Sequence, residues 1–217
     1  SLLQGIGVVI YVTLFGFLSS LIIGLLLAIG RMSKNKILNR ILVLFVELIR
    51  GTPLLVQFFY IYYVVPMLLD AFFLLFGMET GIQIKPVAAG IIGFGINYGC
   101  YMSEVIRSAI MSIDQGQREA GLALGYSEGQ VLFKFIIPPA IRNSIPVFGN
   151  YLVMMVKDTS LLAMISVQEL LLRTKTFASQ TFLTVEAYTL LALVYLVISV
   201  PLSRVSVILE KKLKHTR

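Results

Sequence analysis

The sequence predicts an all-α membrane protein, with one transmembrane domain over residues 1–217 and about five membrane-spanning helices. Three observations support this fold class. Apolar residues make up 58% of the chain and charged residues only 13%, whereas a soluble domain carries about a quarter charged residues. The mean hydropathy is +0.90. Several apolar runs reach the roughly 20 residues that a helix needs to cross a hydrocarbon core about 30 Å thick.

Five apolar runs are long enough to cross a bilayer as helices. They are expected at about residues 5–30, 41–64, 86–107, 145–167 and 185–207. The first run lacks a basic leading segment and is too long for the core of a signal peptide. We therefore expect it to remain in the protein as a span.

Two of these runs carry small residues at every fourth position. They are Gly16, Ser20, Gly24 and Ala28 in the first run, and Gly95, Gly99 and Ser103 in the third. Small residues at this spacing let helix backbones approach closely in lipid, where burial of apolar surface gives no drive for association. The pattern predicts a packing face on each helix.

The basic residues are distributed unevenly between the two sides of the predicted membrane. Four lie in residues 31–40, four in 107–142 and five in the tail from 204, so these segments hold 13 of the 18. The alternate connections, 65–85 and 168–184, hold only three. The positive-inside rule therefore predicts an N-terminus outside the cell and a C-terminus in the cytoplasm.

Polar side chains interrupt the third span. Asn97 and Glu104 are seven residues apart, which is about two helical turns, so they share a face, with Tyr101 close by. A charged group at membrane depth is costly unless it is paired or hydrated. The face formed by these residues is therefore a candidate functional site.

The fourth span contains the stretch "VKDTSLL", in which four polar residues follow one another: Lys157, Asp158, Thr159 and Ser160. A lipid-facing helix would not tolerate this run at mid-depth, so we expect it to face protein or water.

The second span contains "ELIRGTPLLVQ", which combines Glu47 and Arg50 with Gly51, Thr52 and Pro53. Proline lacks a backbone N–H and clashes with the preceding turn, so the helix should break or kink here and expose polar backbone groups. Such interruptions can line a transport site. An alternative stays open, in which the charged residues of the second and fourth spans form structural ion pairs and the proline only kinks its helix.

Carboxylates, amides, hydroxyls and a broken helix together suit a zwitterionic ligand, because acids bind an amine and free N–H groups bind a carboxylate. The candidate substrate-binding residues are Asn97, Tyr101, Glu104, Asp158, Thr159, Ser160, Gly51 and Thr52. Arg50, Pro53 and Lys157 are candidate structural or gating residues.

Several classes of function are disfavoured by the sequence. It contains no P-loop motif and no Gly-Lys pair, so nucleotide binding by a P-loop is excluded. The lone histidine, His215, lies in the basic tail, and no cluster of metal-ligating residues predicts a metal site. The net charge of +7 fits cytoplasmic loops better than nucleic-acid binding. Uphill transport would therefore draw its energy from an ion gradient or from another polypeptide.

The long basic connection, about residues 108–142, contains "REAGLALGYSEGQVLFKFIIPPAIRNSIP". Its first part predicts a short helix with a small-residue face, which Gly125 ends, and Ser127 with Gln130 can start a second helix as a capping box. A compact knob of this kind can enter a groove on a partner. The residues of this segment taken alone favour a simple connecting hairpin over a docking element.

This segment resembles the EAA loop of ABC importer permeases through Glu119, Ala120, Gly125, Ile136 and Pro139, with Gly121 in place of the second alanine of the pattern. Three further stretches resemble the permease subunits for polar amino acids: "RGTPLLVQ", "SEVIRSAIMSIDQGQREA" and "KDTSLLAMISVQELL". The likeness extends from the first span to about residue 175. The family's "AYxAE" pattern is only partly met, because glycine and cysteine occupy positions 99 and 100.

The resemblance implies a permease dimer in a prokaryotic inner membrane, homomeric or heteromeric, with a dimer of cytoplasmic ATPase subunits and an extracytoplasmic solute-binding protein. ATP and Mg would be bound by the ATPase, so this chain would have no cofactor and no catalytic residue. The resemblance also implies that the EAA helix docks into the ATPase. The coupling residues would be Glu119, Ala120, Gly121, Ala123, Leu124 and Gly125.

We therefore expect the translocation subunit of an ATP-driven importer for polar amino acids. Two carboxylates, Glu104 and Asp158, would favour a ligand with an extra positive charge, so basic amino acids are the expected substrates. The alternative is an ion-coupled secondary amino acid transporter that uses one of these acids as its ion site. That alternative leaves the cytoplasmic helix without a role.

Overall fold

The computed structural model describes residues 2–214, all of whose regular structure is helical. His215 lies outside the described residues. The α-helices are α1 (Leu2–Arg31), α2 (Lys36–Arg50), α3 (Leu54–Phe59), α4 (Val65–Leu74), α5 (Pro86–Met111), α6 (Gln115–Ala123), α7 (Glu128–Val131), α8 (Ile137–Asp158), α9 (Leu170–Thr181) and α10 (Thr184–Lys214). Two π-helical turns, η1 (Tyr60–Val64) and η2 (Leu132–Ile136), and a 3₁₀ segment, η3 (Thr159–Ile165), continue these helices.

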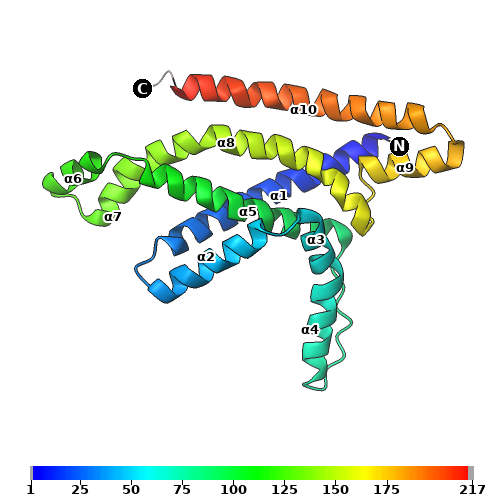
Figure 1. Cartoon of the computed structure of the whole chain (residues 1–217), viewed down its shortest axis with the longest axis horizontal. Coiled ribbons are helices and arrows are strands. Elements are labelled where there is room, and N and C mark those ends of the chain that lie inside the picture. The colour runs from blue at the N-terminus through cyan, green and yellow to red at the C-terminus, as the bar shows by residue number, and fades with distance from the viewer. Residues whose placement is uncertain (1, 215–217) are drawn as a thin grey trace.

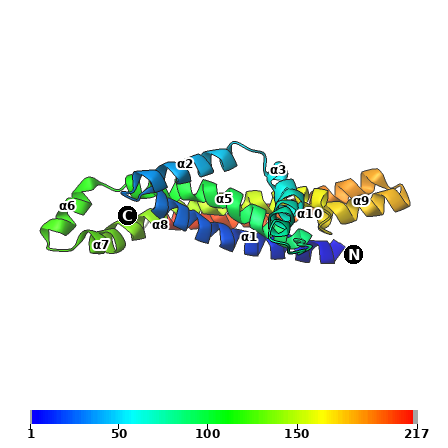
Figure 2. The ribbon, with the colours of Figure 1, turned by 90° about the horizontal axis from the view of Figure 1, so that it is seen from below.

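The long helices run along the length of the molecule. Helix α5 packs along α1, and α10 packs against α8 on the opposite side from α2 (Figure 1). The N-terminus and α9 lie at one end of the molecule, and the α6–α7 hairpin and the C-terminal end of α10 lie at the other (Figures 1 and 2).

Four helical stretches of the described chain are long and apolar enough to cross a membrane. They are Leu2–Arg31, Leu54–Leu74, Glu128–Ile165 and Thr184–Lys212. Helix α5, with 26 residues, is long enough to cross a membrane but is less apolar, and it is not among these four stretches. The four predicted spans other than the second coincide with helices of the structure, namely α1, α5, the continuous α8 and η3, and α10.

The predicted second span, 41–64, is wrong as a single helix. Helix α2 ends at Arg50, and α3 starts at Leu54 after an extended Pro53 with φ −61° and ψ 137°. Proline offers no N–H to the turn before it and disfavours helical geometry in the residue that precedes it, so the helix cannot continue through this point. The sequence did predict this break.

The chain changes direction after the break. The helical stretch from α3 to α4 is apolar enough to be a span, but its ribbon runs crosswise to α1, α5 and α8 (Figures 1 and 2). If those helices cross the bilayer along their length, α4 lies close to the membrane plane. The predicted extracytoplasmic connection, 65–85, thus begins with a helix.

The predicted small-residue faces are confirmed where α1 meets α5. The four small residues of α1, at positions 16, 20, 24 and 28, are all buried. A Cβ on Gly24 would lie 2.9 Å from the Cβ of Met102, and a Cβ on Gly99 would lie 2.8 Å from the Cγ2 of Ile23. Neither distance is compatible with an undisturbed contact, so these glycines set how closely the two helices approach.

The long basic connection, about residues 108–142, folds as predicted at its centre. Helix α6 is followed by Gly125, whose φ of +84° is favourable only for glycine. Helix α7 begins at Ser127 with both hydrogen bonds of a capping box to Gln130. An ion pair of 3.1 Å between Arg118 and Glu128 joins α6 to the start of α7.

Candidate functional site

A cavity of about 440 Å³ lies where the break after α2 meets α5 and α8. Its lining residues come from three segments that are distant in the sequence: Arg50, Gly51, Thr52, Pro53, Leu54, Asn97, Tyr98, Tyr101, Tyr151, Met154 and Asp158. The volume is in the range of small-molecule sites, about 300–1,000 Å³.

The broken helix supplies the positive charge of the cavity. Arg50, the last residue of α2, places its guanidinium 5.1 Å from the centroid of the Tyr101 ring on α5. A cation at this distance is attracted by the ring face. This contact holds the Arg50 side chain against α5 while the guanidinium can still donate hydrogen bonds to an anion.

The opposite wall supplies the negative charge. Asp158 is the last residue of α8, where the α-helix gives way to the tighter 3₁₀ turn of η3. The Tyr98 hydroxyl donates a hydrogen bond of 2.7 Å to Oδ2 of Asp158. The ring centroid of Tyr151 lies 5.9 Å from that of Tyr98 and 6.1 Å from that of Tyr101. Three aromatic rings therefore lie between Arg50 and Asp158.

Gln57 links the broken helix to α5. Its Nε2 donates to the carbonyl oxygens of Ile49 (2.7 Å) and Thr52 (3.1 Å), neither of which accepts the hydrogen bond from residue i+4 that a continuous helix would supply. Its Oε1 accepts a hydrogen bond of 3.1 Å from Nδ2 of Asn97. Gln57 therefore fixes both the geometry of the break and the orientation of the Asn97 amide.

Five of the eight predicted substrate-binding residues line this cavity: Gly51, Thr52, Asn97, Tyr101 and Asp158. Arg50 and Pro53 line it as well. The predicted residues Thr159 and Ser160 do not, because each donates its hydroxyl hydrogen bond within its own turn, to Val156 at 2.6 Å and to Lys157 at 2.8 Å. Lys157 is exposed outside the cavity.

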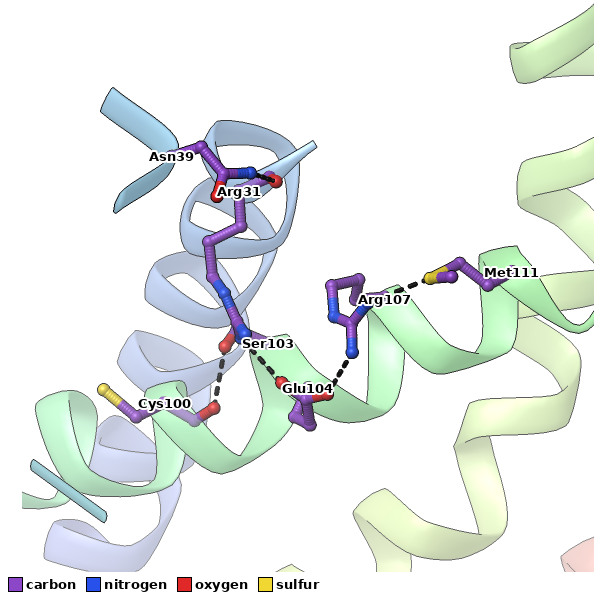
Figure 3. Close-up of polar contacts among 7 residues, drawn as sticks. All are labelled: Arg31, Asn39, Cys100, Ser103, Glu104, Arg107 and Met111. Atoms are coloured by element: carbon purple, nitrogen blue, oxygen red, sulfur yellow. Dashed lines mark hydrogen bonds and ion pairs between the residues drawn. The ribbon is translucent and has the colours of Figure 1, made fainter. Parts of the chain in front are cut away.

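Glu104 lies elsewhere on α5 and is not part of the cavity lining. Its Oε2 is 2.7 Å from Nη1 of Arg31 and its Oε1 is 2.5 Å from Nη2 of Arg107 (Figure 3). The Asn39 amide donates a hydrogen bond to the carbonyl oxygen of Arg31 (Figure 3). The acid that we predicted as a substrate ligand therefore has two cationic partners and ties the end of α1 to α5.

The structural ion pairs proposed as an alternative for the second and fourth spans do not form in the described part of the chain. Glu47, Arg50, Lys157 and Asp158 have no oppositely charged side chain within 4.0 Å there. Arg50 and Asp158 are instead available to a ligand in the cavity.

The sequence analysis missed four residues that line the cavity, Leu54, Tyr98, Tyr151 and Met154, and also Gln57, which supports the cavity from outside its lining. The sequence held signals for three of these five residues. Gln57 lies one helical turn after Pro53, at the end of the stretch "ELIRGTPLLVQ" that was predicted to interrupt the second span. Tyr98 adjoins Asn97, and Tyr151 precedes Asp158 by two helical turns, so it shares a face with it.

The hairpin of α6 and α7 protrudes from one end of the molecule (Figure 1). Glu119, Ala120 and Ala123 are exposed, as are Leu124 and Gly125 beyond the helix. Gly121 is buried, and a Cβ there would lie 2.9 Å from Cγ2 of Val131. Glycine at the position of the family's second alanine thus allows α6 to pack closely on the start of the next helix.

No group of metal-ligating side chains occurs within residues 2–214. The polar groups that line the cavity can bind a polar solute.

Comparison with known proteins identifies relatives along almost the whole chain. Residues 20–215 match the family described as "Binding-protein-dependent transport system inner membrane component". The glutamine transport system permease protein GlnP of Escherichia coli K12 is 34% identical over 98% of this chain and 93% of the relative. The L-cystine transport system permease protein TcyB of Bacillus subtilis is 36% identical over 96% of this chain and 85% of the relative.

Solved structures agree with this assignment. A chain from the crystal structure of an amino acid ABC transporter with histidines matches with a TM-score of 0.84 and 30% identity, over 97% of this chain and 93% of that one. The inward-facing MetNI methionine ABC transporter shares the fold, with a TM-score of 0.65 at 18% identity over 96% and 95% of the two chains.

Proposed function

We propose that this chain, which belongs to the family of binding-protein-dependent transport system inner membrane components, binds its transported amino acid in the cavity between Arg50 and Asp158. It is a multi-pass membrane protein and a permease component of an ABC transporter. Two relatives are named for the transport of glutamine and L-cystine, and a third, an amino acid ABC transporter, was solved with histidines. All three amino acids share the α-carboxylate and α-amino groups.

The observation that carries the proposal is a cation and an anion facing one cavity at a broken helix. Arg50 would bind the α-carboxylate with paired N–H donors, and the free backbone around Thr52 would add further polar groups. Asp158 would bind the α-ammonium group. The cavity would change from being open on one side of the membrane to being open on the other. The helices would move at the Pro53 break and at the change from α-helix to 3₁₀ geometry after Asp158, because few backbone hydrogen bonds must change at these two points.

The hairpin of α6 and α7 supplies the coupling surface in this proposal. Residues 119–125, all exposed except the buried Gly121, would dock into a groove on a separate cytoplasmic ATPase, which would bind ATP and Mg and hydrolyse the nucleotide. The close contact at Gly121 and the exposed ion pair between Arg118 and Glu128 would hold α6 against α7 during docking. The chain itself would need no cofactor.

The complete transporter would contain two permease copies, two ATPase subunits and an extracytoplasmic solute-binding protein. The hairpin end would face the cytoplasm and the α9 end would face outward, as the distribution of basic residues predicts. An ion-coupled secondary transporter is less well supported. Its candidate ion site, Glu104, is already paired with two arginines, and the relatives are ABC permeases.

Uptake into proteoliposomes tests this function. Vesicles that hold the chain with its co-purified ATPase, and with its solute-binding protein outside, should accumulate labelled amino acid only when ATP is present on the ATPase side. Accumulation that follows an ion gradient and ignores ATP would contradict the proposal. The matched control is a vesicle with the Asp158→Asn variant, which should hold the same complex but accumulate little substrate.

A further inference from the structure

The walls of the cavity carry one positive and one negative charge. Arg50 and Asp158 are the only charged residues among its eleven lining residues, and the other nine are neutral. The lining as a whole is therefore electrically balanced. A ligand that brings one charge of each sign would leave no charge in the cavity without a partner.

The nearest other charged groups do not alter this balance. Glu104 is engaged by Arg31 and Arg107, and it is outside the lining. Glu47 and Lys157 adjoin the lining segments in sequence, but neither side chain lines the cavity. A second carboxylate for a basic side chain is thus lacking from the cavity wall.

We infer that this cavity selects amino acids whose side chains are uncharged, an inference that rests on the proposed function. The α-carboxylate and α-ammonium groups use both wall charges. A lysine, arginine or glutamate side chain would add a third charge with no opposite partner, in a cavity at membrane depth where such a charge is unfavourable. The sequence analysis predicted basic substrates because it placed two carboxylates, Glu104 and Asp158, in the site. Glu104 does not line the cavity, so that argument no longer supports a basic substrate.

The neutral part of the wall fits a polar, uncharged side chain. Asn97 presents an amide that is oriented by its hydrogen bond to Gln57, and Tyr101 and Tyr151 bring hydroxyl groups. An amide or hydroxyl side chain can exchange hydrogen bonds with these groups, because each can donate and accept. Met154 and Leu54 cover the aliphatic part of such a ligand.

Equilibrium binding to the purified permease and ATPase complex in lipid nanodiscs tests the inference without the solute-binding protein, which has a selectivity of its own. Labelled glutamine should bind at least about tenfold more tightly than labelled arginine or glutamate. Arginine binding as tight as glutamine binding would overturn the selectivity and leave the proposed site in place. Binding of none of the three would overturn the site itself, and the selectivity with it.

A charge added to the wall provides a second, independent test. Met154 lines the cavity and is 47% exposed, so it can be replaced without opening the core. Met154→Glu should shift the ratio of arginine to glutamine affinity by about tenfold toward arginine, and Met154→Lys should shift selectivity toward glutamate. An unchanged ratio in both variants, with thermal unfolding as in the parent, would overturn the inference.

Two controls separate charge from disruption. Met154→Gln keeps the size and polarity of the first variant without its charge, and it should retain the parent's preference. Met78→Glu places the same charge at a residue that is also 47% exposed but lies in the connection after α4, outside the cavity. It should leave the ratio unchanged, and a shift there equal to that of Met154→Glu would contradict a local effect.

Discussion

The Arg31 guanidinium lies 2.7 Å from the Glu104 carboxylate, and this ion pair joins the last residue of α1 to α5 near the start of the connection that is predicted to be cytoplasmic. Arg107 engages the second oxygen of the same carboxylate. The side chain of Arg31 is only 9% exposed and that of Glu104 is 27% exposed. A partly buried cluster of this kind fixes the position of one helix against another and leaves the carboxylate little capacity for a substrate.

Glu104→Gln should therefore reduce stability and leave substrate selectivity unchanged. The substitution leaves two partly buried guanidinium groups without their counter-ion, which we expect to lower the free energy of unfolding by about 1–3 kcal/mol. Thermal unfolding in detergent measures the first effect, and the ratio of glutamine to arginine binding measures the second. The exposed Glu79→Gln is the control. A selective loss of arginine binding would restore Glu104 as a substrate ligand.

Asp158→Asn and Tyr98→Phe should weaken substrate binding by different amounts. The first removes the charge that binds the α-ammonium group, and a loss of about 2–3 kcal/mol, or roughly 30- to 150-fold in Kd, is expected. The second removes one hydrogen bond to the carboxylate, with an expected loss of about 1 kcal/mol. Isothermal calorimetry with glutamine measures both. A larger effect for Tyr98→Phe would mean that the phenol itself contacts the substrate.

The sequence predicted those features of the fold that depend on a few residues close together in the chain. The proline at 53 predicted the break, and the spacing of small residues predicted the contact between α1 and α5. The crosswise course of α4 could not be predicted. An apolar run of this length has the same composition whether its helix crosses the membrane or lies along it.

The sequence predicted only part of the candidate site, because contacts between different helices decide which polar residues reach the cavity. Asn97 and Glu104 share one face of α5, but seven residues separate them by about 10 Å along the helix, so only one of them reaches the cavity. Whether Glu104 meets a ligand or an arginine depends on where α1 ends, and one helix's own sequence cannot reveal that. The role of Gln57 likewise depends on the carbonyl groups that lose their i+4 helical hydrogen bonds at the break.

Gly24→Ala should destabilise the contact between α1 and α5. The added methyl group would lie 2.9 Å from the Cβ of Met102 and 3.1 Å from the carbonyl oxygen of Gly99, and backbone atoms cannot move aside easily. We expect a loss of about 1–3 kcal/mol. The matched control is Gly7→Ala on the same helix, where the added methyl group has no neighbour within 4 Å. Equal unfolding temperatures for the two variants would contradict close packing at Gly24.

The proposed orientation can be tested with single cysteines in a Cys100→Ser background. Glu79 and Lys34 are both exposed, and they lie in connections predicted to be on opposite sides of the membrane. In intact cells, a membrane-impermeant maleimide should label Glu79→Cys and should label Lys34→Cys only after permeabilisation. The reverse pattern would invert the orientation and place the hairpin of α6 and α7 outside.

Leu124→Arg should uncouple the ATPase from the substrate site while leaving that site intact. Leu124 follows α6 and is 75% exposed, so an arginine fits there without strain but would not fit an apolar groove on a partner. Substrate-stimulated ATP hydrolysis by the reconstituted complex should fall by at least about tenfold, with glutamine binding and thermal unfolding unchanged. Met78→Arg, in the connection after α4, makes the equivalent change away from α6 and should hydrolyse ATP like the parent. Undiminished hydrolysis in Leu124→Arg would mean that the ATPase docks elsewhere.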